Sequence, residues 1–331
     1  MVADFYIEGQ KALEILKRDI QLNTVRQGYI FEGVEGIGKK SAARLFAQMA
    51  LCTGEKKPCN ECHGCRMFLA GSHPDVYILD SSPVKIDSVR QMNDELFVKP
   101  IISDRKVFII EHADEMNTAA QNAFLKSFEE PPSYAVIIMI TTSQNKLLPT
   151  ILSRGTKIAF SPFPEKDIEK FIIDKYSLSG ARASFVAAYS GGVVGRAIDI
   201  VESEEFFKKR DKLIRSTSLL SGDKISILTV LDAFNASGRR ANEDLDLYFD
   251  VFMGFFRDVL VLKQGGRVIN SDYKEIIEEF SAKVRGKAAR NVISIAAEVR
   301  SKINNSMKYD LWITNMLINC WEEIHGTGNR S

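Results

Sequence analysis

A glycine-rich turn between an apolar strand and a helix constrains the fold of this chain more than any other feature. Gly33, Gly36 and Gly38 precede Lys39, after a short apolar run at 29–31 and before a helical pattern at 41–51. Backbone N–H groups in such a turn surround phosphate oxygens at a helix N-terminus, and the lysine adds a positive charge. The order of strand, glycine turn and helix therefore predicts an α/β domain that descends from a phosphate-binding fold.

Two other positions lack the groups that nucleotide hydrolysis requires. A hydroxyl for Mg²⁺ should follow Lys39, but Lys40 stands there. Ser41 carries a hydroxyl one residue later, about 100° around the helix. After a second apolar run come Glu111, which is able to hold Mg²⁺ through water, and His112, a poor replacement for a catalytic carboxylate. Read more simply, these two are polar residues at a strand end. The sequence leaves binding of ATP and Mg²⁺ open, and we expect no ATPase activity of the chain's own.

Alternating strand and helix patterns continue to about residue 160, and helical patterns alone follow. Buried strands are predicted near 76–79, 107–110, 135–141 and 157–160. This alternation predicts a doubly wound α/β fold with a parallel sheet. The change of character at Pro162-Phe163-Pro164 predicts three domains, with boundaries of 1–161, 162–204 and 205–331. The second would be a small three-helix unit and the third entirely helical.

Composition and charge exclude several classes of protein. The formal net charge of the 331 residues is +1, so no global field attracts the chain to nucleic acid or to a membrane. The N-terminus lacks the basic and apolar regions of an export signal, and the apolar runs are too short to span a bilayer. Four of the five cysteines fall between 52 and 65, unlike the dispersed cysteines of a disulfide framework. We expect a cytoplasmic protein without membrane contact.

The cysteine cluster is the strongest metal signal. Cys59, Cys62 and Cys65 are spaced by two residues each, and Cys52 lies seven residues upstream. Four thiolates satisfy tetrahedral Zn²⁺ and leave no open position for catalysis, so a structural zinc site at 52–65 is predicted. An iron–sulfur cluster and free thiols are the alternatives, although position 69, where a ferredoxin pattern needs its fourth cysteine, is leucine. Cys320 stands alone in an apolar helix and is expected in the core.

Several arginines and lysines are candidates for phosphate contacts. Arg154 follows a strand-and-loop region and has the chemistry of an arginine finger, which neutralises a γ-phosphate held by a neighbouring subunit. Arg196 opens a helix after a glycine pair. A basic stretch near the C-terminus is either a phosphate contact or, as we favour, a solvated helix face; it comprises Lys283, Arg285, Lys287, Arg290, Arg300 and Lys302.

Taken together, these motifs resemble the clamp-loader branch of the AAA+ superfamily. The resemblance is carried by the segments 31–39, 117–132 and 148–154, by the four cysteines, and by His73-Pro74-Asp75. The most specific segments are the asparagine-rich helix that ends in Glu129-Glu130-Pro131-Pro132 and the Ser153-Arg154 pair. The match covers about the first 200 residues. Gly155 departs from the family's Ser-Arg-Cys pattern, but the arginine is retained.

The resemblance implies a RecA-like AAA+ domain, a helical lid and a C-terminal collar for oligomerisation. It implies a subunit of a hetero-pentameric loader, with a motor subunit of the tau/gamma type and a delta subunit as partners, which places a sliding clamp on primed DNA. Arg154 then takes the finger's role in trans, Arg196 that of the lid arginine that senses nucleotide, and the four cysteines that of the family's zinc insertion.

Three functions remain open from the sequence. The first is a non-hydrolysing stator that lends Arg154 to a neighbour. The second is an ATPase motor of the tau/gamma type, whose phosphate loop would end in Gly-Lys-Thr and whose acidic motif would read Asp-Glu; Lys40 and His112 argue against it. The third is an AAA+ protein of DNA recombination or repair, which would not need the Ser-Arg finger in this context.

Overall fold

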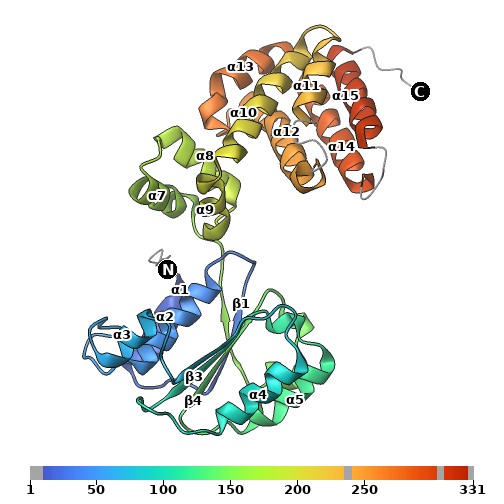
Figure 1. Cartoon of the computed structure of the whole chain (residues 1–331). Helices are drawn as coiled ribbons and strands as arrows, with labels where there is room; N and C mark the ends of the chain where they lie inside the picture. Colours follow the sequence, from blue (N-terminus) through green and yellow to red (C-terminus); the bar gives the residue numbers. More distant parts are fainter. Residues whose placement is uncertain (1–9, 235–240, 304–308, 327–331) are drawn as a thin grey trace. The chain divides into compact units, whose positions relative to one another are not determined.

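The chain forms two compact units, shown in Figure 1. The computed structural model describes residues 10–234, 241–303 and 309–326. The first unit extends to Ile168 and also includes Gly191–Arg196; the second comprises Glu169–Ser190 and the chain from Ala197 onward. The three domains expected from the sequence, with boundaries after 161 and 204, stay a prediction beside this division into two units.

A five-stranded parallel sheet organises the first unit. Its strand order is β2-β3-β4-β1-β5, and all four neighbouring pairs are parallel. The strands are β1 (Gly28–Glu32), β2 (Val76–Leu79), β3 (Lys106–Ile110), β4 (Ala135–Thr141) and β5 (Thr156–Ala159). Every residue of β3 and β4 is buried, as expected for central strands covered on both faces. The predicted α/β fold with a parallel sheet is confirmed.

Helices cover both faces of this sheet (Figure 1). On one face, α4 and α5 pack against side chains such as Phe108 and Ile137. On the other face, Phe46 of α2 lies edge-on to Tyr29 of β1, with ring centroids 4.9 Å apart. The helices of this unit are α1 (Lys11–Gln21), α2 (Lys39–Leu51), α3 (His63–Leu69), α4 (Ile86–Leu96), α5 (Thr118–Glu129) and α6 (Pro149–Leu152), with the 3₁₀ turns η1 (Ala113–Glu115) and η2 (Gln144–Lys146).

The second unit is helical wherever the structure describes it. A core rich in phenylalanine joins its helices, and Phe252, Phe256 and Phe280 are among its buried rings. Cys320 is fully buried in this core, as predicted. The helices are α7 (Glu165–Tyr176), which begins in the first unit, α8 (Gly180–Ser190), α9 (Val194–Glu202), α10 (Glu204–Ser218), α11 (Ser226–Phe234), α12 (Ala241–Lys263), α13 (Lys274–Lys283), α14 (Gly286–Lys302) and α15 (Tyr309–His325), with the 3₁₀ turns η3 (Leu219–Ser221) and η5 (Ser271–Tyr273).

The predicted strands and the helix predicted at 41–51 agree with the structure within a few residues, but the sequence did not predict two short helices, α3 and α6. Seven and four residues are too few to show a helical period. Both helices begin at a local signal instead. The Cys62 side chain accepts a hydrogen bond from Cys65 N at the start of α3, and Pro149 occupies the first turn of α6. Among the described residues, no helix is long and apolar enough to cross a membrane.

Candidate functional site

The glycine loop lies at the carboxyl end of β1 and leads directly into α2. Gly36 and Gly38 have φ angles of 76° and 102°, a region that favours glycine. Lys39 is buried, and its ammonium group donates to the carbonyl oxygens of Gly33 and Val34. Burial lowers the pKa of Lys39. In this arrangement the lysine is satisfied by its own loop, so a phosphate group would have to displace those carbonyl contacts.

An ion-pair cluster fills the position at which a metal ion would be needed. Glu111 follows β3, and its side chain is only 4% exposed. Lys40 Nζ lies 2.7 Å from one oxygen of Glu111, and Arg44 Nη2 lies 3.2 Å from the other. Lys40 Nζ also lies 3.0 Å from His112 Nε2. Because two cations already neutralise Glu111, the residues present do not fit Mg²⁺ at this position.

The segment that contains Arg196 meets the glycine loop through the backbone. Gly195 N donates to Gly36 O at 2.9 Å, and a Cβ atom on Gly195 would lie 2.8 Å from that same oxygen. Only glycine fits such a close approach. The structure thus brings the backbone of Arg196 beside Gly36 of the glycine loop. The role of Gly33, Gly36, Gly38, Lys39, Ser41, Glu111 and Arg196 as a degenerate nucleotide site stays a prediction.

Two polar residues at the same sheet edge were not singled out from the sequence. Thr142 follows β4, and its hydroxyl and backbone N–H both donate to Asp114 Oδ2. Burial raises the pKa of Asp114, but these hydrogen bonds and nearby Lys146 together lower it by more. The pKa of Asp114 therefore lies below its ordinary value. A polar residue immediately after a fully apolar strand was the available signal, since the carboxyl ends of parallel strands meet at one edge.

Arg154 lies at the amino end of the parallel strands, whereas the glycine loop lies at their carboxyl end. It precedes β5 by two residues, and the first residue of β5, Thr156, pairs with Tyr29 near the start of β1. The glycine loop begins only after Glu32, at the other end of β1. The five residues of β1 rise about 3.3 Å each, so the two ends of the strand are separated by roughly 16 Å. Arg154 is therefore not brought together with the predicted nucleotide residues of its own chain.

The departure from the Ser-Arg-Cys pattern has a packing reason. A Cβ atom on Gly155 would lie 2.5 Å from Ile30 Cδ1 and 3.3 Å from Phe128 Cζ. Ile30 is buried, and its side chain fills the space that a larger residue would need. Gly155 thus belongs to the packing of β1, α5 and β5, while the neighbouring Arg154 remains 41% exposed.

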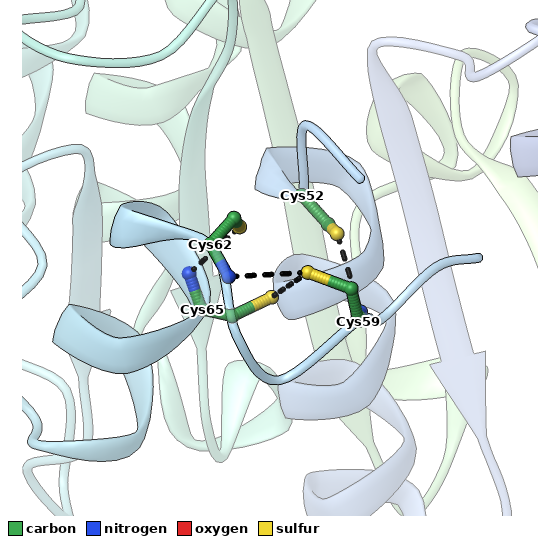
Figure 2. A group of neighbouring side chains, drawn as sticks. All are labelled: Cys52, Cys59, Cys62 and Cys65. Atoms are coloured by element: carbon green, nitrogen blue, oxygen red, sulfur yellow. Dashed lines mark hydrogen bonds between the residues drawn. The ribbon is translucent and has the colours of Figure 1, made fainter. Parts of the chain in front are cut away.

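The four predicted metal ligands converge on one point, as Figure 2 shows. Cys52 follows the last turn of α2, Cys59 lies in the connecting loop, Cys62 caps α3 and Cys65 lies in its first turn. Their sulfur atoms all lie within 4.8 Å of one another. Tetrahedral zinc with bonds of about 2.3 Å needs sulfur atoms about 3.8 Å apart. The separation of 4.0 Å between Cys59 Sγ and Cys65 Sγ fits that requirement.

The surroundings of the sulfur atoms also suit thiolate ligands. Backbone N–H groups of Cys59, Cys62 and Cys65 donate to the sulfur atoms of Cys52, Cys59 and Cys62 in turn. The N–H of Cys65 is the main cause that lowers the pKa of Cys62 to about 5. Burial raises the pKa of the Cys65 thiol to about 12, so metal binding there would release a proton. A Cβ atom on Gly54 would lie 2.9 Å from Cys59 Sγ, so glycine is needed beside this cluster. The residues present fit a closed zinc site.

The C-terminal basic stretch is partly neutralised. Arg300 bonds to Asp246 and Asp250, at 2.8 Å and 2.7 Å, and Lys302 pairs with Glu298 one helical turn away. These contacts support the interpretation of a solvated helix face rather than a phosphate-binding surface.

Comparison with known proteins identifies the family. The model for the DNA polymerase III delta subunit matches residues 9–164, and the model for the C-terminal part of the same subunit matches residues 204–322. The chain belongs to the DNA polymerase III delta-subunit family. The predicted membership of the clamp-loader subunits is thereby confirmed. Within that branch, the motifs quoted above resemble the delta-prime subunit most closely.

Individual relatives are similar over most of this chain. A delta-prime subunit of DNA polymerase III from Bacillus subtilis is 26% identical over 302 residues, which cover 90% of this chain and 91% of the relative. A tau subunit of DNA polymerase III from the same organism is 27% identical over 307 residues, which cover 85% of this chain but 54% of the relative. A DNA polymerase III gamma subunit-related protein of Thermotoga maritima superposes with a TM-score of 0.44 at 21% identity, covering 95% of this chain and 99% of that one.

Proposed function

We propose that this chain is the delta-prime-type stator of a DNA polymerase III clamp loader, which hydrolyses no ATP itself and lends Arg154 to a neighbouring subunit. Its proposed partners are a tau/gamma motor subunit and a delta subunit in a hetero-pentamer, with the sliding clamp and primed DNA engaged through the complex. The proposed setting is the cytoplasm, and the proposed cofactor is one structural zinc ion.

The position of Arg154 carries this proposal. It is exposed at the amino end of the parallel strands, whereas the chain's own glycine loop lies at their carboxyl end. Arg154 is therefore unable to reach a phosphate held in that loop. An arginine finger at this end of the sheet has to serve a site on another subunit.

The ion pairs of Lys40 and Arg44 with Glu111 support the absence of hydrolysis by the chain itself. Without a metal ligand at position 40 and with Glu111 neutralised, two requirements of phosphoryl transfer are missing. A tau/gamma-type motor remains the second candidate because the Bacillus subtilis tau subunit is similar over most of this chain.

The test is ATP turnover, stimulated by clamp and primed DNA, in a loader reconstituted with wild-type or Arg154→Ala chain. Loss of an arginine finger costs about 10³-fold or more at the affected site, so a large fall with a silent isolated chain is expected. Arg215→Ala is the matched control, because this exposed arginine of α10 also lies in an ion pair. Brisk turnover by the isolated chain, unaffected by Arg154→Ala, would instead establish the motor.

A further inference from the structure

The guanidinium of Arg154 is held against its own chain by three contacts. Nη2 lies 3.0 Å from Glu129 Oε1, while Nη1 donates to Thr150 O at 3.0 Å and to Ser153 Oγ at 3.4 Å. Both terminal nitrogens are therefore engaged. Neither Nη1 nor Nη2 is able to bind an external phosphate unless Arg154 first gives up one of these contacts.

Both ends of the ion pair stand on rigid supports. Glu129 is the last residue of α5, directly after Phe128, which is buried in the core between α5 and the sheet. Arg154 directly precedes Gly155, which packs against Ile30. The carbonyl end of α5 adds negative potential near the guanidinium. The contact is thus set by the packing of α5 and α6 and not by a flexible loop.

We propose that Glu129 is a positioning residue that holds Arg154 folded back in the free subunit and releases it to a phosphate on assembly. This inference rests on the proposed function of Arg154 in trans. The two side chains are 41% and 40% exposed, so the pair is weak and water competes with it. A γ-phosphate offers several charged oxygens to the same bidentate fork and therefore displaces a single carboxylate.

The folded-back contact is measured first in the isolated chain. Phenylglyoxal modifies accessible guanidinium groups, and mass spectrometry of the peptide follows Arg154 alone. Glu129→Gln keeps the shape of the side chain but removes its charge, and we expect modification about two- to five-fold faster than in the wild type, the range that an exposed ion pair supports. Glu130→Gln is the matched control, because it removes a neighbouring exposed charge that forms no ion pair with the residues that the structure describes. Its rate should equal that of the wild type. Equal rates for all three chains would overturn the proposal.

Release is then measured in the reconstituted loader at sub-saturating ATP. Glu129→Gln should raise turnover about two- to five-fold at low salt, and the gain should shrink at high salt, which a purely structural effect does not explain. In an Arg154→Ala background the same substitution should have no effect. Unchanged or lower turnover with Glu129→Gln would contradict release, even if Arg154→Ala behaves as a lost finger. If Arg154→Ala itself has no effect, the proposed function fails, whatever the modification rates show.

Discussion

A buried carboxylate lies at each end of the parallel strands in the first unit, and each one connects separate segments of the chain. Glu111 is neutralised at the carboxyl edge by Lys40 and Arg44. Asp75, just before β2, is fully buried and accepts three backbone N–H groups, from Ile101 at 2.6 Å, Ile102 at 3.0 Å and Ser103 at 2.9 Å. The His-Pro-Asp motif noticed in the sequence therefore organises the loop that leads into β3.

This loop contact makes stability depend on pH. Burial raises the pKa of Asp75, but the three N–H donors and His73 together lower it by more than burial raises it. The pKa of Asp75 therefore lies below its ordinary value of 3.8. A lowered folded-state pKa contributes stability above the ordinary pKa, and this contribution is lost as pH falls through the folded-state pKa. We expect Asp75→Asn to lower the free energy of unfolding by about 2 kcal/mol at pH 7, and by progressively less as pH falls below the ordinary pKa of 3.8.

Urea unfolding at several pH values checks this expectation. Asp87→Asn is the control, because the Asp87 side chain is 82% exposed and should affect stability little. A pH-independent difference between wild type and Asp75→Asn would mean that the loop is held by packing and not by the charge.

At the scale of elements, the cysteine cluster joins the end of α2 to α3. A seven-residue helix has little stability of its own, so α3 needs support from outside its backbone hydrogen bonds. Zinc bound by Cys52 and Cys59 on one side and by Cys62 and Cys65 on the other would provide that support.

Metal removal is expected to unfold this element first. Purified protein should carry one zinc ion, and a strong chelator should accelerate amide hydrogen exchange in α3 with little change in β3 and β4. Cys62→Ser should reproduce the effect without chelator, while Cys320→Ser, outside the cluster, should retain the zinc. Visible absorbance from an iron–sulfur cluster in the purified protein would refute the zinc assignment.

At the scale of the whole molecule, a buried arginine ties together helices that the sequence assigned to different domains. Arg210 of α10 is 1% exposed, bonds to both carboxylate oxygens of Asp272 at 2.7 Å, and donates to Asn270 at 2.8 Å. Its guanidinium lies 3.4 Å from the ring centroid of Phe185 in α8. Helices of the predicted lid and of the predicted collar thus share one compact unit.

Removal of this arginine should destabilise the second unit selectively. Arg210→Ala removes the ion-pair partner of Asp272 and one hydrogen bond of Asn270, and it should cost about 3–5 kcal/mol. Arg210→Met keeps much of the apolar packing and should cost less, because a long apolar side chain replaces part of the lost contact. Hydrogen exchange should accelerate in α8 and α10, whereas β3 and β4 should be unaffected. Equal acceleration in both units would show that they unfold together.

Local patterns in the sequence predicted the strands, the parallel sheet and the four cysteines that cluster in the structure. They did so because helix and strand periods, glycine turns and cysteine spacing act over a few residues. The strand and helix near the Gly33 turn, and the cluster of Cys59, Cys62 and Cys65, followed directly from such spacing.

Only the tertiary structure decided which distant residues meet. The pairing of Lys40 and Arg44 with Glu111, the contact of Glu129 with Arg154, and the grouping of α8 with α10 join residues that are far apart in the sequence or on different elements. A spacing rule does not contain these contacts, because they depend on strand order and on which helix face is buried. For the same reason, the sequence alone named Arg154 as a finger, whereas its place at the sheet edge opposite the glycine loop came from the register of β1 with β5.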